Sequence, residues 1–466
     1  MAYFPATQFG AIQWDKALID KYDTRGPRYT SYPTAAQFVP FSAEDYSRCL
    51  TQVKARALEP LSLYVHIPFC QDICYYCACN KVVTRKTDMA ETYLGYLEKE
   101  MALIHQQIGD KRKVTQLHLG GGTPTFLTAG QLTRLVHSLS RYFQLTESAT
   151  REYSIEIDPR TVSRDTLALL KGLGFNRISF GIQDFSPDVQ QAINRINSFK
   201  MVSGLVSAAR DYGFAAINFD LIYGLPKQTL ENMQHTLEQV IELKPARIAF
   251  YNYAHLPDRF SSQRAIDRMT LPSAEQKLDM LNMISRMLTD AGYLYIGMDH
   301  FVLPDDELAI AQQHGRLQRN FQGYSTARAH DLIGLGMSSI TCCHGFFAQN
   351  HKQLDQYYAA LDAGMLATEK GLEVNEDDLK RRGAIMPLIS NLKLSFKEWN
   401  RQFNDDFIHY FAEELEKLQP MQADRLLEIT ATGIEVLPAG RAMIRNICMA
   451  FDAYHDADSG RFSKVI

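Results

Sequence analysis

The sequence predicts an α/β fold: an incomplete (β/α)6 barrel with a TIM-like layout, an N-terminal arm and a mainly helical C-terminal domain. Short runs rich in β-branched and aromatic residues alternate with longer helical patterns from residue 61 onward. No glycine fingerprint for a dinucleotide follows these runs, which favours a barrel over a doubly wound sheet. The distinctive motifs follow the ends of the runs, where a βα barrel builds its site.

The barrel elements can be assigned in chain order. Six predicted strands span residues 61–67, 114–119, 153–157, 177–182, 216–222 and 247–253. Between them, apolar residues recur at three- and four-residue spacing, which predicts helices over 91–109, 130–143, 164–174, 199–213 and 230–243. A further strand is expected at 293–298, after a helix at 275–292. Strand–helix alternation of this length is typical of a parallel sheet covered by helices.

Three domains are expected: residues 1–55, 56–365 and 366–466. The first is an arm that covers the substrate and is rich in Arg and Tyr, as in KYDTRGPRYTSYPT (21–34). The second is the barrel. The third is helical with a hairpin expected within 426–441, a winged-helix-like combination. Its acidic flanks favour docking or lid duty over DNA binding.

Composition excludes several classes of function. The 466-residue chain has a net charge of −4 and no basic run, so we expect no nucleic-acid partner. No uninterrupted run of eighteen apolar residues occurs, so we expect no membrane span. The N-terminus does not resemble a signal peptide, which predicts a cytoplasmic protein. In that reducing compartment, cysteines serve as ligands or catalysts more often than as disulfides.

Four of the eight cysteines fall within CQDICYYCACN (70–80). Cys70, Cys74 and Cys77 have the spacing C-x₃-C-x₂-C, and Cys79 follows. Structural zinc sites usually take two well-separated ligand pairs. Three close thiols after a strand fit three corners of a [4Fe–4S] cluster better, which leaves one iron open. Cys79 is either a fourth ligand or a nearby thiol, and we favour the second because a C-x-C pair would have to fold back on itself.

Further motifs follow the other predicted strands. They are GGGTP (120–124), EIDP (156–159), GIQDF (181–185), FDLIYGLP (219–226) and YNYAHLP (251–257). Because the strands are expected to be parallel, all of these motifs meet at one rim of the barrel.

The cysteine spacing together with GGGTP resembles the radical S-adenosylmethionine (SAM) enzymes. Within them, the chain from about Asp23 to its C-terminus resembles the oxygen-independent coproporphyrinogen III oxidases (coproporphyrinogen dehydrogenases). The resemblance rests on RYTSYPT, YVHIPFC, CYYCACN, HLGGGTPTFL, EIDPR, GIQDF, NFDLIYGLPKQT, YAHLP, GMDHF, RNFQGYST and RNICMAFD. The chain departs from the family at Tyr76, where Phe is common, at Leu119, where Trp is common, and within 325–331.

The resemblance implies a reaction and its cofactors. Two propionates of coproporphyrinogen III become vinyl groups with loss of carbon dioxide, giving protoporphyrinogen IX for haem biosynthesis. A 5′-deoxyadenosyl radical from SAM takes a hydrogen that no acid–base group could remove. The implied cofactors are one [4Fe–4S] cluster and two SAM molecules per chain. A reductant such as flavodoxin or ferredoxin is the expected partner, and the chain is expected to be a monomer.

The resemblance also implies site residues. The cluster ligands are Cys70, Cys74 and Cys77. The first SAM is expected at Tyr64, Gly121, Gly122, Thr123 and Glu156. The second SAM is expected at Tyr76, Gln183, Arg195, Asp220, Ala254 and Ile340. Contacts to the second SAM or to the substrate are expected from Cys79, Arg25, Arg28, Phe321 and Gln322.

Other functions remain open at this point. A related radical SAM protein that binds or degrades haem would share the barrel, although such carriers usually lack Cys79 and RYTSYPT. A zinc or ferredoxin-like interaction protein with a DNA-binding tail is disfavoured by the acidic balance and by the rim motifs.

Overall fold

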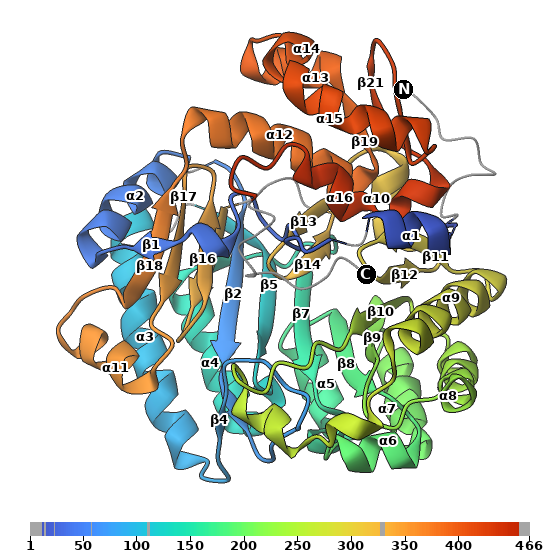
Figure 1. Ribbon diagram of the computed structural model, residues 1–466. Coiled ribbons are helices and arrows are strands. Elements are labelled where there is room, and N and C mark those ends of the chain that lie inside the picture. Colours follow the sequence, from blue (N-terminus) through green and yellow to red (C-terminus); the bar gives the residue numbers. More distant parts are fainter. Residues whose placement is uncertain are drawn as a thin grey trace. The chain divides into compact units, whose positions relative to one another are not determined.

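The structure is a computed structural model that describes residues 12–13, 15–22, 24–56, 58–109, 112–326 and 331–455 (Figure 1). These residues form two compact units. Unit 2 holds residues 38–273 and 329–373, and unit 1 holds the chain up to residue 37, 274–328 and the chain from 374 onward. Residues 327–330 of the segment 325–331 lie outside the described part.

Six parallel strands form the centre of unit 2, and they confirm the predicted fold class. Neighbours in the sheet are consecutive along the chain, and every pair is parallel. The strands are β2 (Leu61–Ile67), β5 (Lys113–Gly121), β7 (Glu152–Ile157), β8 (Arg177–Gln183), β9 (Ala216–Tyr223) and β10 (Arg247–Asn252). A short strand, β6 (Gln144–Leu145), also pairs with β5. Most of their aliphatic and aromatic side chains are buried, as expected for a parallel sheet, and Tyr251 on β10 is an exposed exception.

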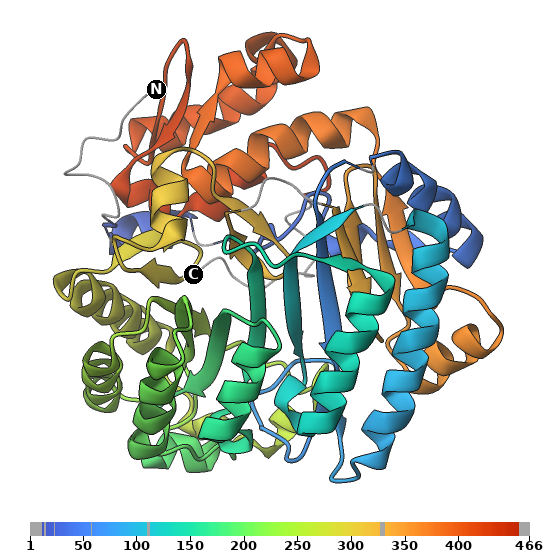
Figure 2. The ribbon, with the colours of Figure 1, turned by 180° about the vertical axis from the view of Figure 1, so that it is seen from behind.

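The helices that follow these strands cover one face of the sheet, as Figure 2 shows for unit 2. They are α3 (Asp88–Ile108), α4 (Ala129–Tyr142), α5 (Arg164–Gly172), α7 (Phe199–Asp211) and α8 (Leu230–Leu243). All five were predicted, and α6 (Pro187–Ala192) is an addition. Thr128, Ser163 and Thr229 cap α4, α5 and α8 with their side-chain oxygens, which fixes where each helix begins.

On the other side of β2 the sheet continues with strands that the sequence analysis did not identify. The order outward from β2 is β15 (Asp331–Leu335), β16 (Ile340–Cys343), β17 (Phe346–Asn350), β18 (Thr368–Glu373) and β1 (Val39–Pro40). β15 is parallel to β2, whereas the later pairs are antiparallel. The helices α2 (Ala43–Ala55) and α11 (Leu354–Asp362) belong to this half of unit 2.

Unit 1 is mainly helical. Its helices are α1 (Lys16–Tyr22), α9 (Ala274–Asp290), α10 (Glu307–Gln313), α12 (Glu376–Asn391), α13 (Phe396–Phe403), α14 (Phe407–Tyr410), α15 (Ala412–Ala423) and α16 (Ile444–Met449). Its strands are β11 (Leu294–Gly297), β12 (His300–Val302), β13 (Gln318–Asn320), β14 (Gly323–Ser325), β19 (Lys393–Ser395), β20 (Leu427–Ile429) and β21 (Gly433–Val436). The strand predicted at 293–298 and the hairpin predicted within 426–441 are both confirmed. The predicted division into an arm (1–55), a barrel (56–365) and a C-terminal domain (366–466) stays a prediction.

Candidate functional site

The cysteine loop is framed by two short strands of unit 2. β3 (Phe69–Cys70) and β4 (Val82–Val83) pair in parallel, directly after β2. The Val82 N–H donates to the Pro68 carbonyl at 2.8 Å, and the Thr84 N–H donates to the Cys70 carbonyl at 2.9 Å. These bonds hold the two ends of the loop together. Residues 71–81 form the loop itself, which carries Cys74, Cys77 and Cys79.

Residues from two rim segments hold this loop from outside. Asn194 donates from Nδ2 to the Ile73 carbonyl at 2.8 Å. Ser262 donates to the Cys77 carbonyl at 2.9 Å, and Gln263 donates to the Tyr76 carbonyl at 3.0 Å. The loop backbone is thus fixed by side chains that follow β8 and β10.

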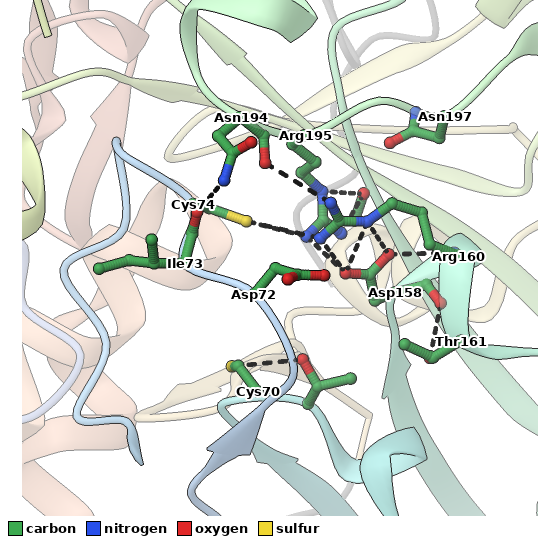
Figure 3. A network of polar contacts seen from close by, with 12 residues as sticks. Cys70, Asp72, Ile73, Cys74, Asp158, Arg160, Thr161, Asn194, Arg195 and Asn197 are labelled. Carbon is green, nitrogen blue, oxygen red and sulfur yellow. Dashed lines mark hydrogen bonds and ion pairs between the residues drawn. The ribbon is translucent and has the colours of Figure 1, made fainter. Parts of the chain in front are cut away.

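Cys74 faces two guanidinium groups, as Figure 3 shows. Arg195 Nη1 lies 3.5 Å and Arg160 Nη2 lies 3.7 Å from the Cys74 sulfur. The same two nitrogens donate to Asp158 Oδ2, at 2.9 Å from Arg195 and 2.7 Å from Arg160. Burial raises the pKa of Asp158, but Arg195 and Arg160 outweigh burial and hold that pKa below its usual range. Two cations and one anion leave a net positive charge beside this sulfur.

Cys70 and Cys77 have different surroundings. The Cys70 sulfur lies 3.5 Å from the Thr123 hydroxyl, and burial raises the pKa of Cys70 to about 11. The Cys77 sulfur accepts the Cys79 N–H at 3.4 Å. A hydrogen bond from the Cys79 thiol lowers the pKa of Cys77 to about 6, against the effect of burial, and Lys81 acts in the same direction.

The three thiols fit a cluster better than a single metal ion. In the part of the chain that the structure describes, no three His, Cys, Asp or Glu side chains converge on one ion. A cluster takes one thiolate for each of several irons, so its ligands need not meet at a point. Donor groups that stabilise negative charge surround the thiols: guanidinium groups at Cys74, and a backbone N–H with Lys81 near Cys77.

The glycines that end β5 pack closely against the residues beside the cysteine loop. A Cβ atom at Gly120 would lie 2.9 Å from Glu156 Oε1, and one at Gly122 would lie 2.4 Å from the Pro68 carbonyl oxygen. Gly121 has a φ of +120°, which residues other than glycine rarely adopt. Its N–H donates to Glu156 Oε2 at 3.3 Å. Only glycine therefore allows the end of β5 to pack this closely against Glu156 and the start of the cysteine loop.

Tyr64 and Glu156 meet through His118. The Tyr64 and His118 rings stack at a centroid distance of 5.8 Å, and His118 Nε2 lies 3.2 Å from Glu156 Oε1. The Tyr64 hydroxyl lies 3.1 Å from His66 Nδ1. The structure thus brings Tyr64, Glu156 and the β5 glycines together.

Three of the residues expected at a second SAM lie on the adjacent strands β8 and β9 or bind to them. Gln183 ends β8 with a left-handed backbone (φ of +67°). Arg195 donates to the Gly181 carbonyl through Nη2 at 2.6 Å. Asp220 on β9 accepts from Ser179 at 2.7 Å, and burial raises the pKa of Asp220 to about 6.

The other three lie on the loop or on flanking elements. Burial raises the pKa of Tyr76 well above its usual value. Ala254 is exposed just after β10. Ile340 begins β16, and a Cβ atom at Gly334, the β15 partner of Tyr64, would lie 2.7 Å from the Ile340 backbone.

Four expected contacts belong to unit 1. Arg28 donates to Asp299 at 2.5 Å, and Arg25 is exposed. Phe321 and Gln322 form the two-residue turn between β13 and β14 and are half-buried.

Sequence reasoning assigned no role to Asp158, Arg160 or His118. Asp158 and Arg160 lie in EIDPR, one of the motifs on which the resemblance rests, so the sequence marked them as candidates. Their contact with Cys74 depends on loop placement, which the motif does not show.

Comparisons with known proteins agree with this geometry. The sequence model of the Radical SAM superfamily matches residues 64–240. The oxygen-independent coproporphyrinogen III oxidase of Pseudomonas aeruginosa is 48% identical over 460 residues, covering 98% of this chain and 99% of its own length. The enzyme of that name from Escherichia coli (strain K12) is also 48% identical, with the same coverage.

A solved structure matches almost the whole chain. Coproporphyrinogen III oxidase (HemN) from Escherichia coli, described as a radical SAM enzyme, superposes with a TM-score of 0.90 at 46% identity. The match covers 96% of this chain and 100% of that one. Among the described residues, no helix is both long and apolar enough to cross a membrane.

Proposed function

The chain belongs to the family of oxygen-independent coproporphyrinogen III oxidases, radical SAM enzymes of haem biosynthesis, and on that premise we propose its reaction. It converts two propionate side chains of coproporphyrinogen III to vinyl groups and releases carbon dioxide, giving protoporphyrinogen IX. The observation that carries this proposal is the anchored loop that presents Cys70, Cys74 and Cys77 beside the glycine-lined end of β5.

The cluster and the first SAM take separate sets of residues. Cys70, Cys74 and Cys77 hold the cluster through their sulfurs. When bound, the cluster and SAM supply the one-electron chemistry that removes a non-acidic hydrogen from a propionate. The backbone of Gly121 and Gly122 and the Thr123 hydroxyl bind the amino-acid part of SAM. The Glu156 carboxylate accepts a hydrogen bond from the amino group of SAM, and the Tyr64 ring packs beside the bound SAM.

A second SAM is part of the proposal, so that each chain takes two. Its contacts are Tyr76, Gln183, Arg195, Asp220, Ala254 and Ile340, with Cys79 nearby. A buried carboxylate such as Asp220 suits paired ribose hydroxyls. Arg195 suits a carboxylate, although it already holds Asp158 and the Gly181 carbonyl.

The remaining partners follow from the chemistry of the substrate. Its four propionates call for cations, and we propose Arg25 and Arg28 of the N-terminal arm among them. The electron comes from a small reductant such as flavodoxin or ferredoxin, and the chain acts as a monomer. A reducing compartment, the cytoplasm, suits the free thiols of the loop.

The direct test is anaerobic reconstitution with iron and sulfide, followed by incubation with reductant, SAM and coproporphyrinogen III. We expect protoporphyrinogen IX, carbon dioxide and 5′-deoxyadenosine from the wild type. A Cys70→Ala, Cys74→Ala, Cys77→Ala variant is expected to give none of them, whereas a Cys342→Ala control retains all three. An opened or methylated ring, or bound haem without decarboxylation, would reject the proposed reaction in favour of a haem-degrading or haem-carrying relative.

A further inference from the structure

A buried guanidinium in unit 1 lacks a partner for two of its nitrogens. Arg319 on β13 is 9% exposed, and its Nε and Nη1 have no hydrogen-bond partner among the described residues. Removing a cation from water without pairing it is costly, so such a group in a folded protein calls for an explanation. The explanation must be local, because the pairing of β13 with β14 fixes the Arg319 backbone.

The side chain in direct contact with Arg319, that of Tyr324, carries no charge. Across the hairpin its guanidinium lies 4.8 Å from the centre of the Tyr324 ring, a cation–π contact. The His300 ring stands edge-on to Tyr324 at 5.1 Å. Burial, and then Arg319, lowers the pKa of His300 to about 4, so His300 is neutral at pH 7. Tyr324 and His300 therefore do not balance the charge of Arg319.

A second donor in the same hairpin is also without a partner. The side-chain Nε2 of Gln322 is buried and has no hydrogen-bond partner in the described part of the chain. The Gln322 backbone is fixed, because its N–H donates to Asn320 Oδ1 at 2.8 Å. Two side chains three residues apart thus present donors, and neither has an acceptor for them.

The carboxylate of this region is already engaged. Asp299 contributes to the electrostatic environment of both His300 and Tyr324, and it accepts from Arg28 at 2.5 Å. Arg28 and Arg319 against Asp299 leave the group with one net positive charge. The group therefore suits a ligand that brings one negative charge and hydrogen-bond acceptors.

We propose that Arg319 and Gln322 form a carboxylate-binding subsite. A carboxylate accepts from a guanidinium and from an amide N–H at the same time, and it neutralises the excess charge. Its identity rests on the proposed function: the ligand is one propionate of the tetrapyrrole. The inference adds Arg319 to substrate recognition and gives Gln322 a defined role as the second donor.

The test is anaerobic equilibrium dialysis of coproporphyrinogen III against the reconstituted enzyme with SAM but without reductant, so that no turnover occurs. Arg319→Gln is expected to raise the dissociation constant at least about tenfold, the usual loss for a hydrogen bond to a charged group. Arg316→Gln removes an exposed arginine three residues earlier and is expected to leave the dissociation constant unchanged. Arg319→Lys, which keeps the charge, is expected to fall between.

Further measurements keep the inference falsifiable. Gln322→Leu is a smaller change and decides the matter if Arg319→Gln does not fold, as judged by circular dichroism. Wild-type affinity in a folded Arg319→Gln protein, or in Gln322→Leu when that variant must decide, overturns the subsite. Iron content is expected to match the wild type in all variants. Product formation by the wild type tests the proposed function separately, so a failed reaction cannot be mistaken for a failed subsite.

Discussion

Asp158 is the residue that organises the surroundings of Cys74. It accepts from Arg195 and from Arg160, and each of those nitrogens also approaches the sulfur. Without Asp158, the two guanidinium groups would repel each other. One buried carboxylate thus keeps two N–H donors beside the Cys74 sulfur. Hydrogen bonds to a cluster ligand, the role proposed for Cys74, raise the reduction potential of the cluster.

Arg160→Gln is therefore expected to shift the midpoint potential of the bound cluster to more negative values. The reason is the loss of one N–H···S hydrogen bond and of one positive charge. The measurement is potentiometric titration followed by electron paramagnetic resonance. Arg164→Gln, which removes an exposed arginine paired with Asp211, is the matched control and is expected to leave the potential unchanged. An unchanged or more positive potential in Arg160→Gln would contradict this account of Asp158 and Arg160.

Cys79→Ala separates the two roles that the sequence left open for this thiol. Alanine retains the Cys79 backbone N–H that donates to the Cys77 sulfur and removes only the bond from the Cys79 thiol. We expect full iron content and the cluster spectrum of the wild type, with product formation reduced at least about tenfold. Cys77→Ala serves as the reference for a true ligand and is expected to lose most of its iron. Iron loss from Cys79→Ala equal to that from Cys77→Ala would make Cys79 a fourth ligand.

At this scale the sequence predicted which residues share a loop better than it predicted their contacts. The spacing of Cys70, Cys74 and Cys77 limits them to one loop, and their role as cluster ligands stays a prediction. Arg195 was expected at the second SAM, and its ion pair with Asp158 was not predicted. Such pairing depends on where β7 and the segment after β8 meet, which is tertiary information.

The end of β5 is shaped by the elements beside it. Pro68 follows β2, and its carbonyl oxygen lies so close to Gly122 that a methyl group would overlap it. The same added atom would lie 3.0 Å from the Cys70 sulfur. The glycine therefore sets the spacing between β5 and the start of the cysteine loop.

Gly122→Ala is expected to displace that loop and to lower bound iron at least about twofold, because Pro68 is backbone and cannot rotate away. Gly130→Ala is the control: it lies in the first turn of α4 with nothing within 4 Å of an added Cβ, and it is expected to stabilise the helix by roughly 0.5–1 kcal/mol. Iron analysis and thermal unfolding check both variants. Normal iron content in Gly122→Ala would show that the strand end tolerates a shift.

Glu100 links α3 to the strands that the sequence analysis did not identify. Its carboxylate accepts from the Gly336 N–H at 2.7 Å, the Tyr357 hydroxyl at 2.7 Å and the Asn350 side chain. Burial raises the pKa of Glu100 to about 7, from 4.5. Between pH 4.5 and 7 the folded state therefore binds more protons than the unfolded state at this residue. Its contribution to the free energy of unfolding falls as pH rises through that window.

Glu100→Gln is expected to remove this part of the pH dependence. Relative to Glu100→Gln, the wild type is expected to lose about 1–3 kcal/mol of unfolding free energy between pH 5 and pH 8. The measurement is urea unfolding of both proteins at the two pH values. Glu147→Gln, which changes an exposed glutamate, controls for net charge. Parallel pH profiles for the wild type and Glu100→Gln would mean that Glu100 keeps an ordinary pKa.

The elements that sequence reasoning did not identify share a physical cause. β15 is buried at all five positions, so it shows no alternation, and glycine interrupts it. β1 has only two residues and takes its place by pairing with β18, far along the chain. Periodicity detects helices and long strands, whereas short strands such as β1 depend on partners that the local sequence does not show.

The division of the whole molecule also follows tertiary contacts. The predicted barrel domain, residues 56–365, stays a prediction; by their contacts, residues 274–328 group with unit 1. Gln312 donates to the Ser390 carbonyl at 2.8 Å, and Asn391 Oδ1 accepts the Leu317 N–H at 3.0 Å. These bonds tie α10 and β13 to the end of α12, over a separation of more than seventy residues that no local pattern encodes.

Cluster loading is expected to stabilise unit 2 locally rather than the whole chain. All three proposed ligands lie on the loop 71–81 or at its start, and that loop is anchored to residues near 194 and 262. Metal binding adds its free energy to the folded state of the residues that it joins.

Hydrogen–deuterium exchange, measured anaerobically on apo and reconstituted protein, should therefore show slower exchange at 70–83, 193–195 and 261–265. The buried helices α12 and α16 of unit 1 serve as the internal reference and should exchange equally in both states. Equal protection throughout the chain would instead mean that the two units open together, and no change at 70–83 would contradict the ligand assignment itself.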